Sequence, residues 1–110
     1  EGLDESKRVV GFPVLKGAEF LEEEIRKYTS KKNWQLVYDY HFGGYAKTTS
    51  ALMKFLNDFE NEHHIPLDPV YTAKMMFGVI DLIKKKFFPP GSRIFVVHTG
   101  GLQGRNGFNL

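Results

Sequence analysis

The sequence predicts an α/β fold in which helices cover both faces of a parallel sheet, a three-layer α/β/α arrangement. Three apolar runs of strand type, residues 8–15, 34–40 and 93–98, alternate with segments of helical periodicity. Strands separated by helices of ten or more residues imply parallel pairing through right-handed crossovers. The last run is apolar without alternation, as is typical of a strand covered on both faces. We therefore expect residues 93–98 at the centre of the sheet.

The first half of the chain contains a strand–helix–strand unit. Residues 8–15 are apolar and partly β-branched, and they end at the turn signal Lys16-Gly17. Over residues 19–28, apolar side chains recur at helical spacing, and acidic residues precede basic ones as the helix dipole favours. Residues 34–40 are rich in aromatic and β-branched residues and end near Gly43-Gly44, where the chain must turn.

The second half contains two further helices before the last strand. A hydroxyl among residues 48–50 can cap a helix that ends near His63-His64. Two prolines then require a loop over residues 65–69. The next helix spans residues 71–86, where Gly78 allows close packing against the sheet. Its apolar side chains are expected to face inward: Met75, Met76, Val79, Ile80 and Ile83.

Composition and charge exclude several classes of protein. The 110 residues are 42% hydrophobic and 25% charged, which is normal for one globular domain or a piece of one. A net charge of +2 is too small and too scattered for a nucleic-acid surface, so no nucleic-acid partner is expected. Cysteine is absent, which excludes disulfides and thiolate metal sites. No apolar stretch is long enough for a membrane span, and residues 1–6 lack a signal pattern, so we expect a cytoplasmic protein.

Clusters of histidine and lysine have simpler explanations than a site. His63-His64 has no third imidazole nearby, so a helix-end role is favoured and no metal is predicted. His98 is either catalytic or holds the adjoining glycine loop through a backbone hydrogen bond, and we leave it out of the catalytic set. Lys84-Lys85-Lys86 is interpreted as a solvated helix end.

Three loops fall at the carboxyl edge of the predicted sheet, where ligands of open α/β sheets bind. They cover residues 42–45, 68–72 and 98–104, and they combine glycine or proline with tyrosine or a hydroxyl. The last loop fits neither the dinucleotide GxGxxG pattern nor the Walker phosphate loop. From spacing alone, a bare turn explains this loop equally well.

The motifs in these loops resemble those of a known enzyme family. The family's C-terminal signature is similar to Leu67-Asp68-Pro69-Val70-Tyr71-Thr72-Ala73-Lys74 followed, after a helix and a strand, by His98-Thr99-Gly100-Gly101. The upstream turn Gly44-Tyr45 is similar too. The family is that of 1-aminocyclopropane-1-carboxylate deaminase and D-cysteine desulfhydrase, within the tryptophan synthase β-like, fold type II group of pyridoxal-phosphate enzymes. The resemblance covers residues 7–109, so residues 1–110 are expected to be the C-terminal portion of the catalytic domain.

The resemblance implies roles for five residues. Tyr71 and Tyr45 would be catalytic, Tyr71 against the cofactor ring and Tyr45 on the substrate side. Thr99 would offer its hydroxyl to the pyridine nitrogen of pyridoxal phosphate, with Thr72 close to the same region and Gly100 also in the cofactor-binding set. Hydroxyl residues at both threonine positions follow the desulfhydrase pattern, because the deaminases proper carry a glutamate and a leucine there.

The implied function is deamination of a small amino acid, 1-aminocyclopropane-1-carboxylate or D-cysteine, to a 2-oxo acid and ammonia. The parent enzyme is expected to be a homodimer. In the family, the Schiff-base lysine, the phosphate loop and the serine nucleophile lie upstream of these motifs, so the 110-residue chain alone is expected neither to bind pyridoxal phosphate tightly nor to be active. Two alternatives stay open: a stand-alone, non-catalytic ligand-binding α/β module, and a structural fragment that packs through exposed apolar surface.

Overall fold

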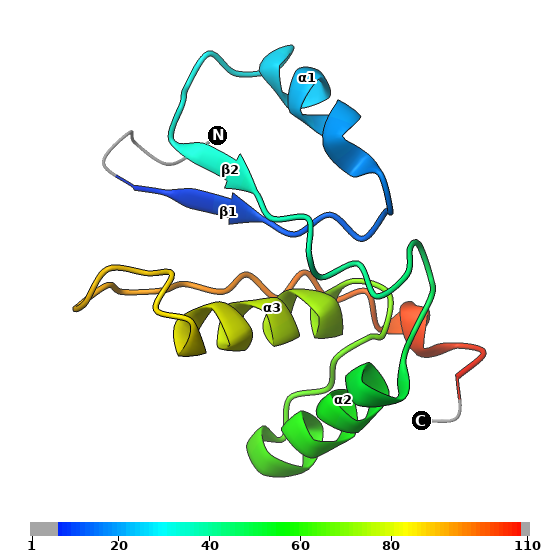
Figure 1. Ribbon diagram of the computed structural model, residues 1–110. Coiled ribbons are helices and arrows are strands. Elements are labelled where there is room, and N and C mark those ends of the chain that lie inside the picture. Colours follow the sequence, from blue (N-terminus) through cyan, green and yellow to red (C-terminus); the bar gives the residue numbers. More distant parts are fainter. Residues whose placement is uncertain (1–6, 109–110) are drawn as a thin grey trace.

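The computed structural model describes residues 7–108, which form an α/β unit with a small parallel sheet (Figure 1). The elements in chain order are β1 (Val9–Gly11), the 3₁₀ helix η1 (Ala18–Phe20), α1 (Leu21–Arg26), β2 (Trp34–Leu36), α2 (Ser50–His63), α3 (Thr72–Lys84) and the 3₁₀ helix η2 (Leu102–Arg105). The α/β class is therefore confirmed. Residues 1–6, in which no signal pattern was found, lie outside the described residues, as do residues 109–110.

The two strands pair in parallel, as predicted, but each is shorter than expected. Val9 lies opposite Trp34 and Gly11 opposite Leu36, and the Val37 amide donates to the Gly11 carbonyl over 2.9 Å. Beyond Gly11 the ladder stops near Pro13, which has no amide hydrogen to donate. The chain connecting the strands passes through η1 and α1, as the predicted crossover requires.

Helix α1 has a solvated charged face, as the sequence predicts. Arg26 pairs with Glu22 over 3.2 Å and Lys27 with Glu24 over 3.0 Å, on the exposed side of the helix. The opposite side is only partly covered: no residue of α1 is buried, and Tyr28, just past its end, is 82% exposed. The predicted amphipathic helix therefore forms, but within the described residues no buried core lies beneath its apolar face.

The hydrophobic core lies between α2 and α3 and not against the sheet. Its buried members come from α2, the loop after it and α3: Leu52, Leu56, Leu67 and Ala73. Partly buried side chains pack around them: Phe42, Phe55, Phe59, Met76 and Phe77. Both predicted ends of α2 are confirmed, because the Thr49 hydroxyl accepts the Leu52 amide over 3.1 Å and His64 closes the helix with a left-handed φ of 57°.

Gly78 brings α3 close to the segments that follow the strands. A Cβ atom at this position would lie 2.6 Å from Cε1 of Phe12 and 3.1 Å from Cδ2 of Tyr40. Close packing at Gly78 is therefore confirmed, but its partners are aromatic rings just past the strands and not the sheet itself. Beside this contact the Tyr40 hydroxyl donates to Asp81 over 2.6 Å, and burial together with this bond raises the pKa of Tyr40. Val79 is buried as predicted, whereas Ile83, in the last turn of α3, is 50% exposed.

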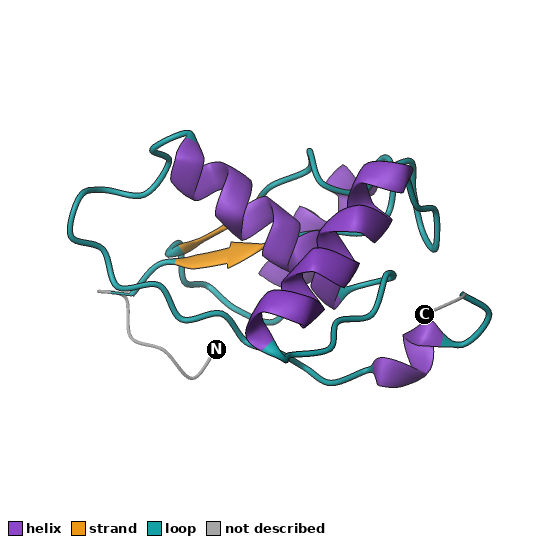
Figure 2. Ribbon diagram, turned by 90° about the horizontal axis from the view of Figure 1, so that it is seen from below, coloured by secondary structure: helices purple, strands orange, loops and turns teal. Residues whose placement is uncertain are grey.

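The predicted central strand over residues 93–98 is wrong for this structure. The segment is loop, and most of its side chains are exposed, with Phe95 88% and Val97 68% exposed. A strand needs a neighbour to bond its amides and carbonyls. In residues 7–108 the sheet consists of β1 and β2, and neither pairs with this segment. Long stretches of loop connect the helices and strands (Figure 2). The three-layer arrangement therefore stays a prediction. No helix within the described range is long and apolar enough to cross a bilayer.

Candidate active site

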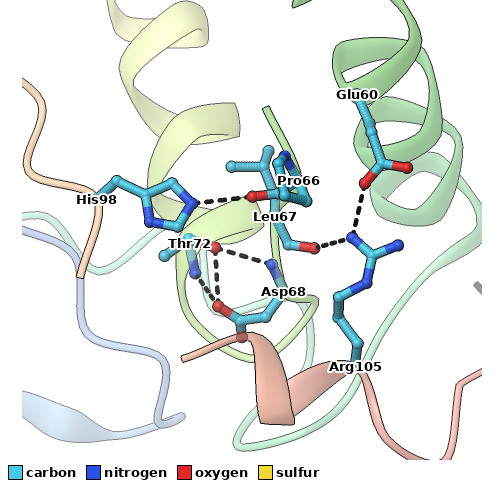
Figure 3. A network of polar contacts seen from close by, with 7 residues as sticks. All are labelled: Glu60, Pro66, Leu67, Asp68, Thr72, His98 and Arg105. Carbon is cyan, nitrogen blue, oxygen red and sulfur yellow. Dashed lines mark hydrogen bonds and ion pairs between the residues drawn. The ribbon is translucent and has the colours of Figure 1, made fainter. Parts of the chain in front are cut away.

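Asp68 organises the start of α3. Its carboxylate is fully buried, and Oδ1 accepts the amides of Val70 over 2.8 Å and Tyr71 over 2.7 Å. The other oxygen, Oδ2, accepts the Thr72 amide over 3.0 Å and the Thr72 hydroxyl over 2.7 Å (Figure 3). These amides belong to the turn that a helix start leaves without intrahelical partners. Tyr71 is thereby held in a fixed place at the N-terminus of the helix.

The hydroxyl of Thr72 is engaged within this turn. It donates to Asp68 and also accepts the Asp68 amide over 2.9 Å, and the residue is only 2% exposed. The turn is covered by η2, where a Cβ at Gly104 would lie 2.9 Å from the Asp68 carboxylate. Arg105 adds a tie, because one guanidinium nitrogen donates to the Leu67 carbonyl over 2.9 Å and to Glu60 over 2.8 Å (Figure 3). Thr72 can therefore support a ligand through packing, while its hydroxyl serves the helix cap.

Tyr71 and Tyr45 form a phenol pair. Their hydroxyl oxygens are 2.9 Å apart, and the rings meet edge to face with centroids separated by 6.0 Å. Both side chains are about half exposed, so the pair lies at the surface of this chain. The hydrogen bond with Tyr45 raises the pKa of Tyr71, and partial burial and the nearby charge of Asp68 raise it further. Tyr71 is therefore a neutral phenol at physiological pH that can donate a proton.

A hollow of about 180 Å³ lies beside Tyr71, beyond the carboxyl end of β1. Its walls come from β1 and the residues after it, from the start of α3 and from the end of the extended segment: Val10, Gly11, Phe12, Val14, Tyr71, Thr72, Met75, Val97 and Thr99. Its place agrees with the rule that ligands bind beyond the carboxyl ends of strands. Ligand pockets typically enclose about 300–1,000 Å³, so this hollow is smaller than a typical ligand pocket.

His98 holds the glycine loop that follows Thr99. Its Nδ1 accepts the Gly100 amide over 3.0 Å, so Nε2 carries the hydrogen and donates to the Pro66 carbonyl over 2.9 Å (Figure 3). Gly100 has a φ of 82°, a conformation that favours glycine. The structural alternative for His98, a backbone hydrogen bond that orients the loop, is therefore confirmed.

Curated relatives match most of the chain. A protein named putative 1-aminocyclopropane-1-carboxylate deaminase from Pyrococcus furiosus is 36% identical over 112 residues, which covers 93% of this chain. Proteins named 1-aminocyclopropane-1-carboxylate deaminase from Rhizobium rhizogenes and Rhizobium leguminosarum are 32% identical over 85 residues and 28% identical over 120 residues. These two matches cover 77% and 97% of the chain. The chain belongs to the 1-aminocyclopropane-1-carboxylate deaminase family. No protein-family profile matches it.

The match covers only part of each family member. The chain spans 33%, 25% and 35% of the lengths of these three relatives, about a third at most. As the motifs predicted, it corresponds to a C-terminal portion of the 1-aminocyclopropane-1-carboxylate deaminase chain.

The structure brings four of the five predicted site residues together. Tyr71, Thr72 and Thr99 line one hollow, and Tyr45 joins them through its bond to Tyr71. Gly100 lies next to this group, with its amide bonded to His98. The catalytic and cofactor-binding roles of these residues stay predictions for the family. Among residues 7–108, no cluster of three histidine or acidic side chains could hold a metal ion.

Three residues that organise the site were missed from the sequence: Asp68, Lys74 and Arg105. Asp68 had a local signal, because an aspartate shortly before a helix is a good cap. Lys74 had a weaker signal: it lies four and eight residues before Gly78 and Leu82, which places the three residues in one row along the helix. In the structure Gly78 and Leu82 are both buried. Arg105 had none, because its partners Glu60 and Leu67 are about forty residues away. Lys74 is fully buried and bonded to two carbonyls, so it is not available for covalent attachment of a cofactor.

Proposed function

We propose that the complete enzyme containing this chain is a pyridoxal-phosphate-dependent deaminase or lyase, and that it converts a small amino acid to a 2-oxo acid and ammonia. The observation that carries this proposal is the meeting of Tyr45, Tyr71 and Thr99 beside one hollow. The names of the relatives support the reaction class, because each denotes a deaminase of a small amino acid. The chain contributes one wall of the site.

The residues around the hollow fit one face of the cofactor ring. Tyr71 offers an aromatic surface, Thr99 a hydroxyl, and Val10 with Gly11 a small apolar surface. When bound, pyridoxal phosphate supplies an electron sink for negative charge that develops on the substrate. No lysine is among the described residues that line the hollow, so the covalent anchor is proposed to come from the upstream part of the enzyme.

Tyr71 holds the proton that the reaction moves. Its phenol lines the hollow and carries a proton at neutral pH, so Tyr71 is placed to donate that proton to a substrate atom, and its raised pKa favours the return of the proton to Tyr71 afterwards. Tyr45 bonds the Tyr71 oxygen over 2.9 Å, and this bond orients the phenol. Both rings are half exposed in this chain, and the remainder of the enzyme would cover them and exclude water.

Thr99 favours D-cysteine as the substrate. A hydroxyl leaves a pyridine nitrogen essentially neutral, whereas a carboxylate favours its protonated form and a deeper electron sink. Because the Thr72 hydroxyl is bound to Asp68, the Thr99 hydroxyl is the one that can meet the ring nitrogen. We therefore propose that the enzyme eliminates hydrosulfide from D-cysteine, with water completing the release of pyruvate and ammonia, in preference to opening a cyclopropane ring.

The substrate preference is tested by assaying the complete enzyme on both amino acids. Hydrosulfide and pyruvate are measured with D-cysteine, and 2-oxobutanoate with 1-aminocyclopropane-1-carboxylate. We expect kcat/KM to be higher for D-cysteine by about tenfold or more, because the ring environment acts on the bond-breaking step. Turnover of only the cyclopropane substrate would overturn the desulfhydrase preference. No turnover of either substrate would overturn the proposed function.

The extended segment 93–98 is proposed to be a strand of a three-layer sheet in the complete enzyme. Its support is chemical: residues 94–97 are all apolar, yet Phe95 and Val97 are largely exposed in this chain. An apolar extended run gains most when a neighbouring strand bonds its backbone and other elements cover its side chains. The tryptophan synthase β-like fold would supply both.

Hydrogen exchange distinguishes a paired strand from a loop. Amides of residues 93–98 are expected to exchange at least about a hundredfold more slowly in the complete enzyme than in the 110-residue chain, because ladder bonds protect them. Amides in the middle of α2 serve as the control, since they are bonded within the helix in both molecules. Equally fast exchange of residues 93–98 in both molecules would rule out the three-layer proposal.

A further inference from the structure

Lys74 lies buried beneath the loop that carries Tyr45. The residue has no exposed surface, and its Nζ donates to the His41 carbonyl over 2.8 Å and to the Gly44 carbonyl over 3.0 Å. The side chain thus reaches from the first turn of α3 to the loop that follows β2. Nothing in the proposed reaction gives this lysine a chemical step.

Burial makes Lys74 dependent on these two bonds. Desolvation lowers the pKa of Lys74, and the negative charge of Asp68 acts in the opposite direction. A buried ammonium without hydrogen-bond partners is strongly unfavourable. The side chain can therefore remain inside only while the two carbonyls stay in reach, which couples its position to that of the loop.

The loop that Lys74 contacts has an unusual backbone. Phe42 and Ala46 adopt left-handed conformations with φ of 55° and 58°, and between them Gly43 and Gly44 have φ of 100° and 129°. Left-handed residues other than glycine persist where surrounding contacts hold them. The carbonyls of His41 and Gly44 lie at the two ends of the turn, where the Gly44 amide also bonds the His41 carbonyl over 3.2 Å. Lys74 therefore fixes both ends of this turn.

The same end of α3 contacts the loop at a second point. Tyr45 directly follows Gly44 in the loop. Tyr71 precedes Lys74 by three residues, so these two residues at the start of α3 lie towards the same side of the helix. Lys74 bonds the loop through its ammonium, and Tyr71 bonds it through the phenol of Tyr45. We propose that Lys74 is a positioning residue, which holds Tyr45 within hydrogen-bond distance of Tyr71 by bonding the carbonyls of His41 and Gly44. Its effect on turnover rests on the proposed function, whereas the positioning itself does not.

Nuclear magnetic resonance of the 110-residue chain tests the positioning directly. Lys74→Met keeps the side-chain length and removes all donors. We expect this variant to lose the nuclear Overhauser contacts between the Tyr45 and Tyr71 rings, while those between Phe55 and Phe77 in the core, with centroids 5.3 Å apart, persist. Unchanged contacts between the two tyrosines in a variant that keeps the core contacts would overturn the proposal.

A control and a second measurement keep the test decisive. Lys54→Met removes an exposed lysine of α2 and is expected to leave both sets of contacts unchanged. If Lys74→Met does not fold, scalar couplings across the hydrogen bonds of the native chain test the proposal instead. Couplings from Nζ of Lys74 to the carbonyl carbons of His41 and Gly44 are expected, and their absence would contradict the proposal.

Kinetics of the complete enzyme test the catalytic consequence. Lys74→Met is expected to lower kcat about tenfold or more while KM changes less than about threefold, because a displaced phenol impairs proton transfer more than binding. Equal proportional changes in kcat and KM would argue against positioning. A native enzyme inactive on both substrates would refute the proposed function, and the resonance experiment would still decide the role of Lys74.

Discussion

Replacing Asp68 with alanine is expected to lower the free energy of unfolding of the 110-residue chain by about 3 kcal/mol. The variant leaves the amides of Val70, Tyr71 and Thr72 without their acceptor, together with the Thr72 hydroxyl. Losing a helix cap costs about 1 kcal/mol, and unpaired buried donors add about 1–3 kcal/mol. Urea denaturation followed by far-ultraviolet circular dichroism measures the change.

A second aspartate provides the matched control for this experiment. Asp58 is an exposed residue of α2 that pairs with Lys54 on the helix surface. Asp58→Ala is expected to change stability by less than about 0.5 kcal/mol, because solvent screens exposed pairs. A cost below about 1 kcal/mol for Asp68→Ala would show that the cap is less important than its hydrogen bonds imply.

Replacing Tyr71 with phenylalanine is expected to lower kcat of the complete enzyme about a hundredfold or more. The change removes the hydroxyl that donates the proton and keeps the ring that faces the hollow. Stability should change little, because the phenol is half exposed and bonds only Tyr45 among the described residues. Steady-state kinetics with each substrate, at protein concentrations checked by cofactor absorbance, measure the effect.

Two further tyrosine variants serve as comparisons for Tyr71→Phe. Tyr45→Phe removes the orienting partner and is expected to have a smaller effect on kcat than Tyr71→Phe, because Tyr71 keeps its own proton. Tyr28 is 82% exposed beyond the end of α1, so Tyr28→Phe is expected to leave kcat unchanged. If Tyr71→Phe retained more than about a third of native kcat, Tyr71 could not be the proton donor.

Local signals explain which elements could be predicted. Helix α2 formed with Thr49 as its cap and His64 at its end, because a cap, a periodic apolar face and a terminating loop all lie within one short segment. Residues 93–98 carried an equally clear strand pattern and did not form one. A strand depends on a partner elsewhere in the chain, and within residues 7–108 none pairs with this run.

The candidate site shows the same division. The order of the loops brought Tyr45, Tyr71 and Thr99 to one region, as their motifs predicted. The hydrogen-bond partners of the polar groups could not be predicted from the sequence. The Thr72 hydroxyl serves the Asp68 turn, and Lys74, noted from the sequence only as part of the family signature, proved to be a buried donor to two carbonyls.

By itself, the sequence determined the α/β class, the helices α2 and α3 and the family to which the chain belongs. Each depends on residues near one another in the chain or on motifs that can be compared directly. Only the tertiary structure decided which strands pair, where the core lies and which buried groups bond which partners. The reason is physical: backbone pairing and the burial of charge depend on contacts between segments distant in sequence, such as the thirty residues that separate Lys74 from Gly44.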